Sequence, residues 1–292
     1  MKIFLTGGSG FIGKNLLESL GSKYDIMSPS HKELDLLDAD AVKDFFKQDY
    51  WDIVIHSAVK PGHRIAADFS KILFSNTSMF FNLVRNSDRF GKMLFLSSGA
   101  AYDMNNYLPK MKEEYFDVHV PVDDIGLSKY ISAKYIELAD KIVELRVFGV
   151  FGKYEDYAIR FISNAICKAI FDLPITIKQN RVFDYLFTDD LAKIVDFFII
   201  NNSKFKAYNI TPDESYELKT LAEKVLQISR KDLPIKIAKD GLGIEYTGTN
   251  DRLRQEIPNL KFTYIDNAIQ QLYKWYLLNK DKIDKEVLLT DR

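Results

Sequence analysis

The sequence lacks several features that would narrow the class of protein. It has a single cysteine, Cys167, which excludes an internal disulfide and the usual multi-cysteine metal sites. Lys and Arg number 40 against 41 Asp and Glu, so the net charge of -1 gives no general attraction to nucleic acid or to an anionic membrane. The histidines are scattered without metal-ligand spacing, and we predict no metal site.

Membrane-spanning and targeting segments are not found in the sequence either. No apolar run reaches the roughly 20 residues that a membrane span needs, and "MKIFLTGG" leads directly into a strand and a turn without a signal-peptide pattern. Hydrophobic residues make up 47% of the chain and charged residues 28%, which predicts a sizeable core and excludes wholesale disorder. We expect a soluble cytoplasmic protein with neither nucleic acid nor membrane as a partner.

The first half of the sequence alternates short apolar runs with segments that have helical spacing. Five runs are rich in Ile, Val, Leu or Phe without strict alternation, as in parallel strands buried on both faces: residues 2–6, 24–28, 52–57, 92–97 and 141–148. This alternation predicts an α/β fold with a doubly wound parallel sheet of the Rossmann type.

The alternation of predicted strands and helices becomes irregular after about residue 150, where no regular strand–helix–strand pattern is found. We predict a dinucleotide-binding Rossmann domain made of residues 1–152 together with about 181–211. Residues 153–180 and 212–292 are predicted to form a smaller C-terminal substrate lobe, so that the chain returns once to the main sheet.

A glycine-rich stretch, "TGGSGFIG" at residues 6–13, directly follows the first strand and opens the first helix. Gly7 permits a tight turn, Gly10 lets the backbone approach a pyrophosphate, and Gly13 lets the helix pack closely on the sheet. The first amides of the helix would then face the phosphates. We predict dinucleotide binding by Gly7, Gly10, Phe11, Ile12 and Gly13.

The end of the second strand suggests which dinucleotide binds. NAD-binding domains usually place an Asp or Glu there to hold the ribose 2′-hydroxyl. Here donors and positive charge take that place, and we expect cofactor contacts from Ser28, Ser30, His31 and Lys32. This set suits a 2′-phosphate, so NADP(H) is favoured and NAD(H) remains possible. A solvated polar turn is the alternative interpretation.

Further motifs follow in a fixed order: "TGGSGFIG", "ELDLLDADAV" (33–42), "DIVIHSA" (52–58), "NTSMFFNLV" (76–84), "LFLSSGAAYD" (94–103), "GLSKYISAKYIE" (126–137), "LRVFGVFG" (145–152) and "FDYLFTDDLA" (183–192). With these motifs the chain resembles the extended short-chain dehydrogenases/reductases of the NAD-dependent epimerase/dehydratase family, which mostly act on nucleotide sugars. Residues 33–102 are most similar to GDP-fucose synthase and the 4-keto-sugar reductases.

The resemblance assigns roles to individual residues. Ser98 matches the serine that polarises the substrate carbonyl, and Lys129 matches the lysine that holds the nicotinamide ribose. Asn76 matches an asparagine on the helix behind the nicotinamide, and Ala58 and His56 would line the adenosine-diphosphate side. The resemblance therefore implies Ser98 and Lys129 as catalytic residues.

The family's catalytic tyrosine stands four residues before the lysine, and that residue is Ile125 here. An isoleucine side chain has no proton to give and no charge to carry. Three accounts stay open. Another group supplies the proton, the reaction runs without the phenol, or the protein binds a cofactor without catalysis.

Several other side chains could replace the missing phenol. Tyr130 and Lys134 repeat the family's Tyr-x-x-x-Lys spacing. Tyr130 lies five residues after Ile125, which is about 140° around the helix, so we expect it to point out of the cofactor cleft. The remaining candidates are Tyr102, Asp124, His119 or a water molecule held by Ser98.

Two further positions bear on the reaction. GDP-fucose synthase pairs a cysteine with a histidine for epimerisation, and the matching positions here are Ala100 and about Arg160. Without that pair, reduction of a 4-keto-sugar nucleotide is favoured over epimerisation or dehydration. A catalytically silent NAD(P)-binding protein is the alternative. We expect substrate contacts from Ser98, Arg160, Arg181 and Arg252, although surface arginines would show the same pattern.

Two helices carry apolar residues on more than one face. Residues 68–90 include Phe74 and Phe81, and residues 126–139 include Tyr135. In this family such a helix pair commonly forms a dimer interface, and aromatic side chains suit one. We therefore expect a homodimer through these helices, with plain core packing as the alternative.

Overall fold

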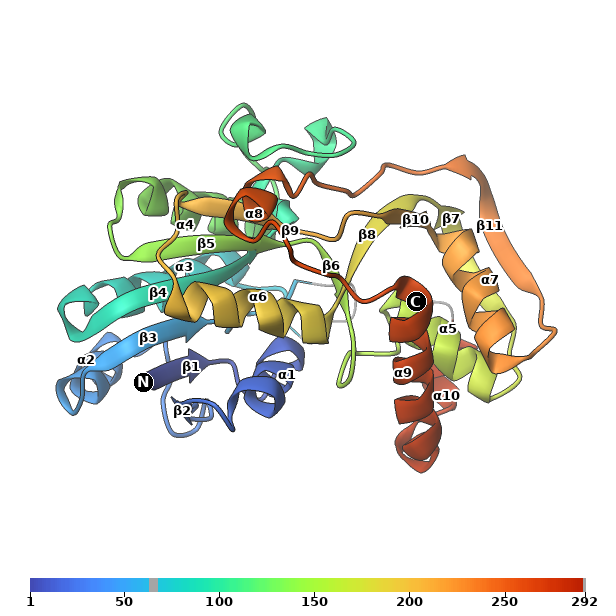
Figure 1. Cartoon of the computed structure of the whole chain (residues 1–292), viewed down its shortest axis with the longest axis horizontal. Coiled ribbons are helices and arrows are strands. Elements are labelled where there is room, and N and C mark those ends of the chain that lie inside the picture. The colour runs from blue at the N-terminus through green and yellow to red at the C-terminus, as the bar shows by residue number, and fades with distance from the viewer. Residues whose placement is uncertain (63–67, 291–292) are drawn as a thin grey trace.

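The computed structural model describes residues 1–62 and 68–290. Six strands of the described chain form one parallel sheet in the order β2-β1-β3-β4-β5-β9. Its strands are β1 (Lys2–Thr6), β2 (Asp25–Met27), β3 (Trp51–His56), β4 (Phe90–Ser98), β5 (Ile142–Val147) and β9 (Ala207–Ile210). The α/β fold predicted from the sequence is confirmed (Figure 1).

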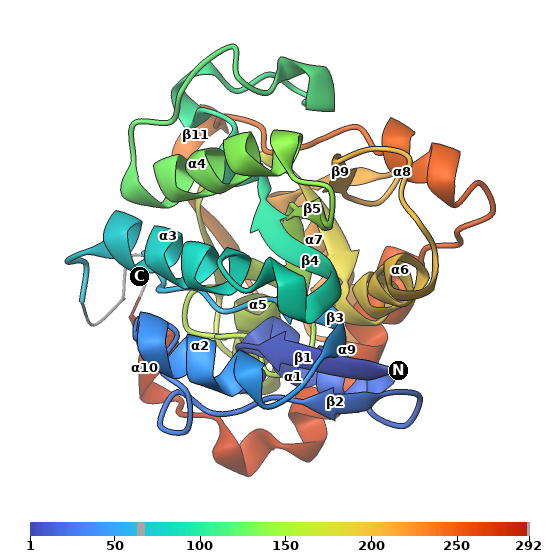
Figure 2. The ribbon, with the colours of Figure 1, turned by 90° about the vertical axis from the view of Figure 1, so that its left-hand side faces the viewer.

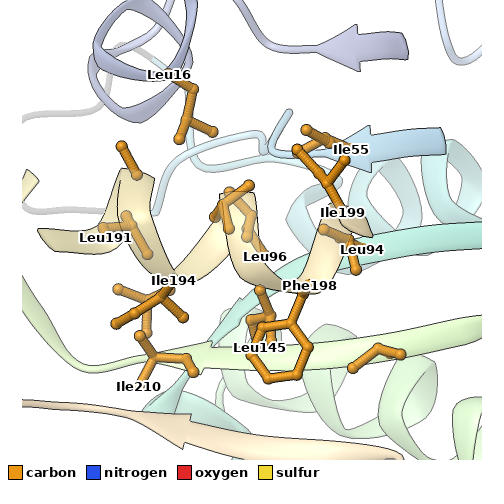
Figure 3. Close-up of a cluster of buried hydrophobic side chains, with 14 of the residues drawn as sticks. Leu16, Ile55, Leu94, Leu96, Leu145, Leu191, Ile194, Phe198, Ile199 and Ile210 are labelled. Carbon is orange, nitrogen blue, oxygen red and sulfur yellow. The ribbon is translucent and has the colours of Figure 1, made fainter. Parts of the chain in front are cut away.

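Helices cover both faces of this sheet (Figure 2). They are α1 (Phe11–Leu20), α2 (Ala39–Lys47), α3 (Ile72–Val84), α4 (Asp124–Leu138) and α6 (Thr188–Ile200). Leu145 of β5 belongs to the core under α1 and α6, whereas Ile142 packs under α2, α3 and α4. Both faces are apolar because the sheet is buried on both sides, which explains why its strands show no polar alternation. Figure 3 shows the α6 side of this core.

Asp123 fixes the start of α4, the helix that carries Ile125 and Lys129. Its carboxylate accepts a hydrogen bond from the Gly126 amide at 2.8 Å, which satisfies one of the amides left free in the first turn. The helix therefore begins at Asp124, two residues before the predicted start at residue 126. The predicted helix 68–90 is shorter than expected, because α3 begins at Ile72 and ends at Val84.

A smaller lobe packs beside the main sheet and has its own core. Its strands are β6 (Gly149–Phe151), β7 (Ile175–Asn180), β8 (Val182–Phe187), β10 (Ser215–Glu217) and β11 (Ile235–Leu242), and its helices are α5 (Phe161–Ile170), α7 (Leu218–Ser229), α9 (Ile265–Leu278) and α10 (Glu286–Leu289). Strand β8 falls in the segment that the sequence assigned to the Rossmann domain, but it pairs with β6 and β10 instead. Strand β9 is the last strand of the main sheet, and helix α6 packs on that sheet.

Residues 243–264, which we call the C-terminal strap, leave the lobe after β11, form α8 (Asp251–Glu256) beside β9 and return to α9 (Figure 1). Gly248 forms a bridge with Met111 on the way, and Tyr246 forms one with Phe183 of β8. The strap therefore joins the lobe to the main sheet near the carboxyl end of β5.

A buried ion pair holds β5 to its surroundings. Glu144 and Arg146 are almost fully buried, and the Arg146 Nη2 lies 2.8 Å from the Glu144 carboxylate. Arg146 also donates to the Tyr102 hydroxyl at 2.8 Å, and that hydroxyl donates to the Asn209 side chain at 2.8 Å.

Within the described part of the chain, no helix has the length and hydropathy needed to cross a membrane.

Candidate functional site

The glycine-rich loop joins β1 to α1 at the carboxyl edge of the sheet. Gly7 has a φ of 74°, a left-handed conformation that favours glycine. At Gly13 a side chain would collide with the backbone of Gly7 and Gly8, so the close packing of α1 on the loop requires its absence. The first turn of α1 contains no acidic residue, so its free amides present an anion-binding site to a phosphate.

A cavity of about 360 Å³ opens beside this loop. It lies where the strand order reverses between β1 and β3, the position at which doubly wound sheets bind nucleotides. Its walls come from the ends of β1 and β3, the loop after β2 and helix α3, and include Gly7, His31, Leu34, Asp35, Leu36, Ala58 and Met79. The sequence analysis assigned no role to Leu34–Leu37 or Met79, although the motif "ELDLLDADAV" marked the first of these segments.

The polar residues after β2 fit a nucleotide at this position. The Ser28 hydroxyl is buried beside Gly8 and has no hydrogen-bond partner in the described chain. The His31 side chain is exposed at the cavity wall, with Nδ1 3.6 Å from the Asp35 carboxylate. The Ser30 amide is already bound by Glu33 at 2.7 Å. Of these groups, the exposed His31 ring can donate to a ribose or a phosphate, and the Ser28 hydroxyl is the one left without a partner among the described residues.

Lys129 and Ser98 lie further along the same edge of the sheet. Ser98 ends β4, and its hydroxyl accepts a bond from the Ala100 amide at 3.3 Å. Lys129 is 7% exposed, and its ammonium lies 3.5 Å from the Leu96 carbonyl and 4.7 Å above the Phe95 ring. Burial lowers the pKa of Lys129 to about 8, while the Glu144 carboxylate opposes that shift.

His56 lies at the end of β3 and is fully enclosed. Its Nδ1 is 2.8 Å from the Thr6 hydroxyl, and its ring stacks on Phe95. Burial lowers the pKa of His56 to about 3, and the nearby Lys129 adds to that shift. His56 is therefore neutral at physiological pH, and it supports the end of β1 from inside.

Asn76 of α3 clamps the loop that follows β3. Its side chain accepts from the Lys60 amide at 2.7 Å and donates to the Lys60 carbonyl at 3.2 Å. These bonds fix the path of the loop past Ala58, which is in the cavity wall. Asn76 thus shapes the cofactor cleft through the backbone.

Ile125 faces the same loop. Its side chain packs beside Gly62 and Ile72, so closely that a methyl group on Gly62 would lie 2.8 Å from the Ile125 Cγ1 and 3.1 Å from the Ile72 Cδ1. The position that should hold a phenol is therefore an apolar contact between α4, α3 and the loop after β3.

Three of the side chains considered from the sequence are engaged elsewhere. Tyr130 and Lys134 both bind Asp117 at the surface, whereas the neighbouring Lys129 is buried. The Tyr102 hydroxyl is buried between Arg146 and Asn209. Its bonds are complete, and it does not face the cofactor cleft.

The three predicted substrate arginines divide into two groups. Arg160 and Arg181 both lie close enough to Tyr185 to influence its phenol electrostatically, and within the described residues neither has a carboxylate partner within ion-pair distance. Arg252 is bound to Glu114 at 2.8 Å and to the Ala207 carbonyl at 3.3 Å. Ala207 is the first residue of β9, so Arg252 lies toward the amino edge of the sheet.

The comparison with known protein families agrees with this architecture. Residues 3–211 match the family described as "NAD dependent epimerase/dehydratase family". The chain belongs to this family. Among curated members, the chain is similar to GDP-L-colitose synthase of Yersinia pseudotuberculosis, with 26% identity over 233 residues that cover 72% of this chain and 75% of that one. It is 30% identical to GDP-L-fucose synthase of Azorhizobium caulinodans over 148 residues, 48% of this chain and 47% of the relative.

Solved structures of the family share the fold at low identity. A GDP-mannoheptose C4 reductase from Campylobacter jejuni with NADP bound superposes with a TM-score of 0.80 at 22% identity, covering 94% of this chain and 98% of that one. A UDP-glucose 4-epimerase from Thermus thermophilus in complex with NAD gives a TM-score of 0.77 at 18% identity over 94% and 98%. The fold is thus common to reductases and epimerases of this family.

The pKa of Lys129 leads to a test of the cofactor site. We predict that the affinity for NADPH falls about tenfold between about pH 7 and about pH 9, because the ammonium loses its proton as the pH rises through its pKa. Fluorescence titration of NADPH across this range measures the effect. Lys129→Met should bind weakly at every pH, and Lys134→Met should keep the wild-type profile. A flat wild-type profile would contradict the role of Lys129.

Proposed function

We propose that this protein is an NADP(H)-dependent reductase of a 4-keto nucleotide sugar. The observation that carries the proposal is that the glycine loop, the cavity beside it, Ser98 and the buried Lys129 all lie along the carboxyl edge of one parallel sheet. The family membership supports a cofactor-dependent reaction, and the relatives named for nucleotide sugars support the substrate class.

The residues of the cleft fit the cofactor. The amides at the start of α1 would hold the pyrophosphate, the cavity would take the adenosine, and Ser28, His31 and Lys32 would meet a 2′-phosphate. When bound, the nicotinamide supplies a hydride. The unpartnered Ser28 hydroxyl and the lack of a carboxylate at the end of β2 support NADP(H) over NAD(H).

The chain's own side chains would bind and orient the substrate. The Ser98 hydroxyl would donate to the substrate carbonyl oxygen, where negative charge develops. The Lys129 ammonium would donate to the ribose hydroxyls and keep a positive charge near the reacting atoms. Arg160 and Arg181 are the candidates for the substrate diphosphate, because they have no carboxylate partner in the described chain. Arg252 is not part of this proposal.

Ala100 supports reduction over epimerisation. A methyl group stands where the epimerising relatives are expected to carry a cysteine, so no thiol is available there to remove a proton from the carbon next to the ketone.

Ile125 favours a second candidate function, a protein that binds NAD(P) without turnover, because the usual proton donor is absent.

A direct assay separates these two functions. We expect NADPH to be oxidised by the purified protein in the presence of one member of a panel of 4-keto nucleotide sugars, and NADH less efficiently. Ser98→Ala should lower turnover about 100-fold, since it removes the donor to the developing oxyanion. Lys134→Met is the matched control and should leave turnover unchanged. Tight NADPH binding without turnover on any substrate would establish the silent protein instead.

We also propose a homodimer through α3 and α4. The two helices lie side by side (Figure 2), and they expose a group of large apolar side chains that includes Phe74 at 62% and Leu138 at 88%. Tyr135 of α4 packs edge to face on Phe81 of α3 beneath this surface. Exposed apolar clusters of this kind are typical of protein–protein contacts.

Light scattering after gel filtration tests the dimer. The wild type should elute at twice the mass of one chain, and Phe74→Glu should shift it to the monomer, because a buried charge without a partner is costly at an interface. Tyr264→Glu, which changes a highly exposed aromatic residue at the end of the strap, should leave the mass unchanged. A wild-type monomer would rule the interface out.

A further inference from the structure

The cleft needs a proton donor that position 125 does not supply. A ketone that accepts a hydride becomes an alcohol only if its oxygen also receives a proton. Ile125 cannot give one, and its side chain makes apolar contacts with Gly62 and Ile72 instead. A donor from another element would have to reach the carboxyl end of β4.

The C-terminal strap brings a tyrosine to this point. The Tyr246 hydroxyl lies against Gly99, the residue that follows Ser98. Because consecutive Cα atoms are about 3.8 Å apart, the phenol lies beside the serine proposed to bind the carbonyl. The Tyr246 side chain is partly exposed.

Gly99 and Tyr246 depend on one another. A methyl group on Gly99 would lie 2.7 Å from the Tyr246 hydroxyl oxygen and 3.0 Å from its Cζ, so any side chain at position 99 would displace the phenol. The absence of a side chain at Gly99 is what allows a residue from the strap to reach the end of β4.

The ring of Tyr246 is held on three sides. Its centroid lies 5.2 Å from those of Phe148 and Tyr107 and 5.8 Å from that of Phe183. These rings come from the ends of β5 and β8 and from the segment after β4. A side chain held in this way points its hydroxyl in a fixed direction, as proton transfer requires.

A cation lies near the same phenol. Arg160, at the start of α5, is close enough to lower the pKa of Tyr246 through its charge. Arg160 is also one of the side chains predicted to contact the substrate, so a candidate substrate cation lies within electrostatic reach of the tyrosine of the strap.

We infer that Tyr246 is the catalytic acid of this protein and takes the place of the tyrosine missing at position 125. This inference rests on the proposed reduction. The phenol O–H bond breaks as a new O–H bond forms on the substrate oxygen, while the carbonyl carbon takes the hydride and the nicotinamide is oxidised. The phenolate then regains a proton from water in the cleft.

The electrostatic setting matches this direction of transfer. Burial raises the pKa of the Tyr246 phenol, although Arg160 and the Gly99 backbone oppose the shift. The phenol is therefore fully protonated at neutral pH, as an acid must be at the start of a reduction.

Tyr246→Phe tests the inference most simply, because it removes one hydroxyl and keeps the ring. We expect turnover with NADPH and the 4-keto substrate to fall about 100-fold, and the affinity for the C4-hydroxyl product in calorimetry to fall about fivefold. The matched control is Tyr107→Phe, whose hydroxyl is buried and unpartnered in the described chain. It changes the same aromatic cluster and should alter neither quantity.

Two further variants distinguish a chemical role from a structural one. Gly99→Ala should mimic Tyr246→Phe by displacing the phenol, and the double variant should be no worse than either single one, because both remove the same contact. Ile125→Tyr should not raise turnover, since the site has a donor already. A rise in activity with Ile125→Tyr would overturn the inference.

The outcomes separate the inference from the function on which it rests. Normal turnover in Tyr246→Phe, with an active wild type, would overturn the role of Tyr246 and leave the reductase standing. An inactive wild type that still binds NADPH would overturn both. Loss of activity in Tyr246→Phe together with unaltered product affinity and an equal loss in Tyr107→Phe would assign the tyrosines to packing, and would also overturn the inference.

Discussion

The parallel pairing of β1 with β3, and of β3 with β4 and β5, is the constraint on which the site depends. Parallel strands end at a common edge of a sheet, and here that edge collects the glycine loop, Ala58 and Ser98. Each of these residues comes from a different part of the sequence, and none would meet the others without the sheet. The cavity lies where the strand order reverses, because neighbouring loops turn away from each other at that point.

A buried ion pair on β5 stabilises the sheet next to the same edge. Glu144 and Arg146 neutralise each other, and Arg146 also donates to the Tyr102 hydroxyl, which donates to the Asn209 side chain. Breaking one partner of such a pair costs about 3–5 kcal/mol, because a buried charge is left alone. The Glu144 carboxylate also keeps a negative charge near Lys129, which opposes the loss of its proton on burial.

The sequence predicts the parts of the site that local spacing determines. The glycine loop, the strands of the main sheet and Lys129 four residues after Ile125 follow from patterns within short windows, and the structure gives the neighbouring Lys129 and Tyr130 different partners, the Leu96 carbonyl and Asp117. Leu34–Leu37 could have been assigned to the adenosine cavity from their motif.

The strap could not have been predicted in the same way. Tyr246 lies in an irregular segment without apolar periodicity, and its contact with Gly99 joins residues that are far apart in the sequence. The same limit applies to Arg252, which the sequence analysis placed among the substrate contacts. Only the fold shows that Glu114 binds this arginine at the other edge of the sheet.

We infer that this protein keeps the cofactor site and the serine typical of its family, while its proton donor, Tyr246, comes from a different element. A crystal structure with NADP⁺ and the C4-hydroxyl nucleotide sugar bound is the most direct measurement of that claim. The account predicts that the Tyr246 and Ser98 hydroxyls both lie within hydrogen-bonding distance of the sugar O4, with Ile125 in apolar contact only. A sugar O4 bound by Ser98 and another donor, with Tyr246 turned away, would contradict it.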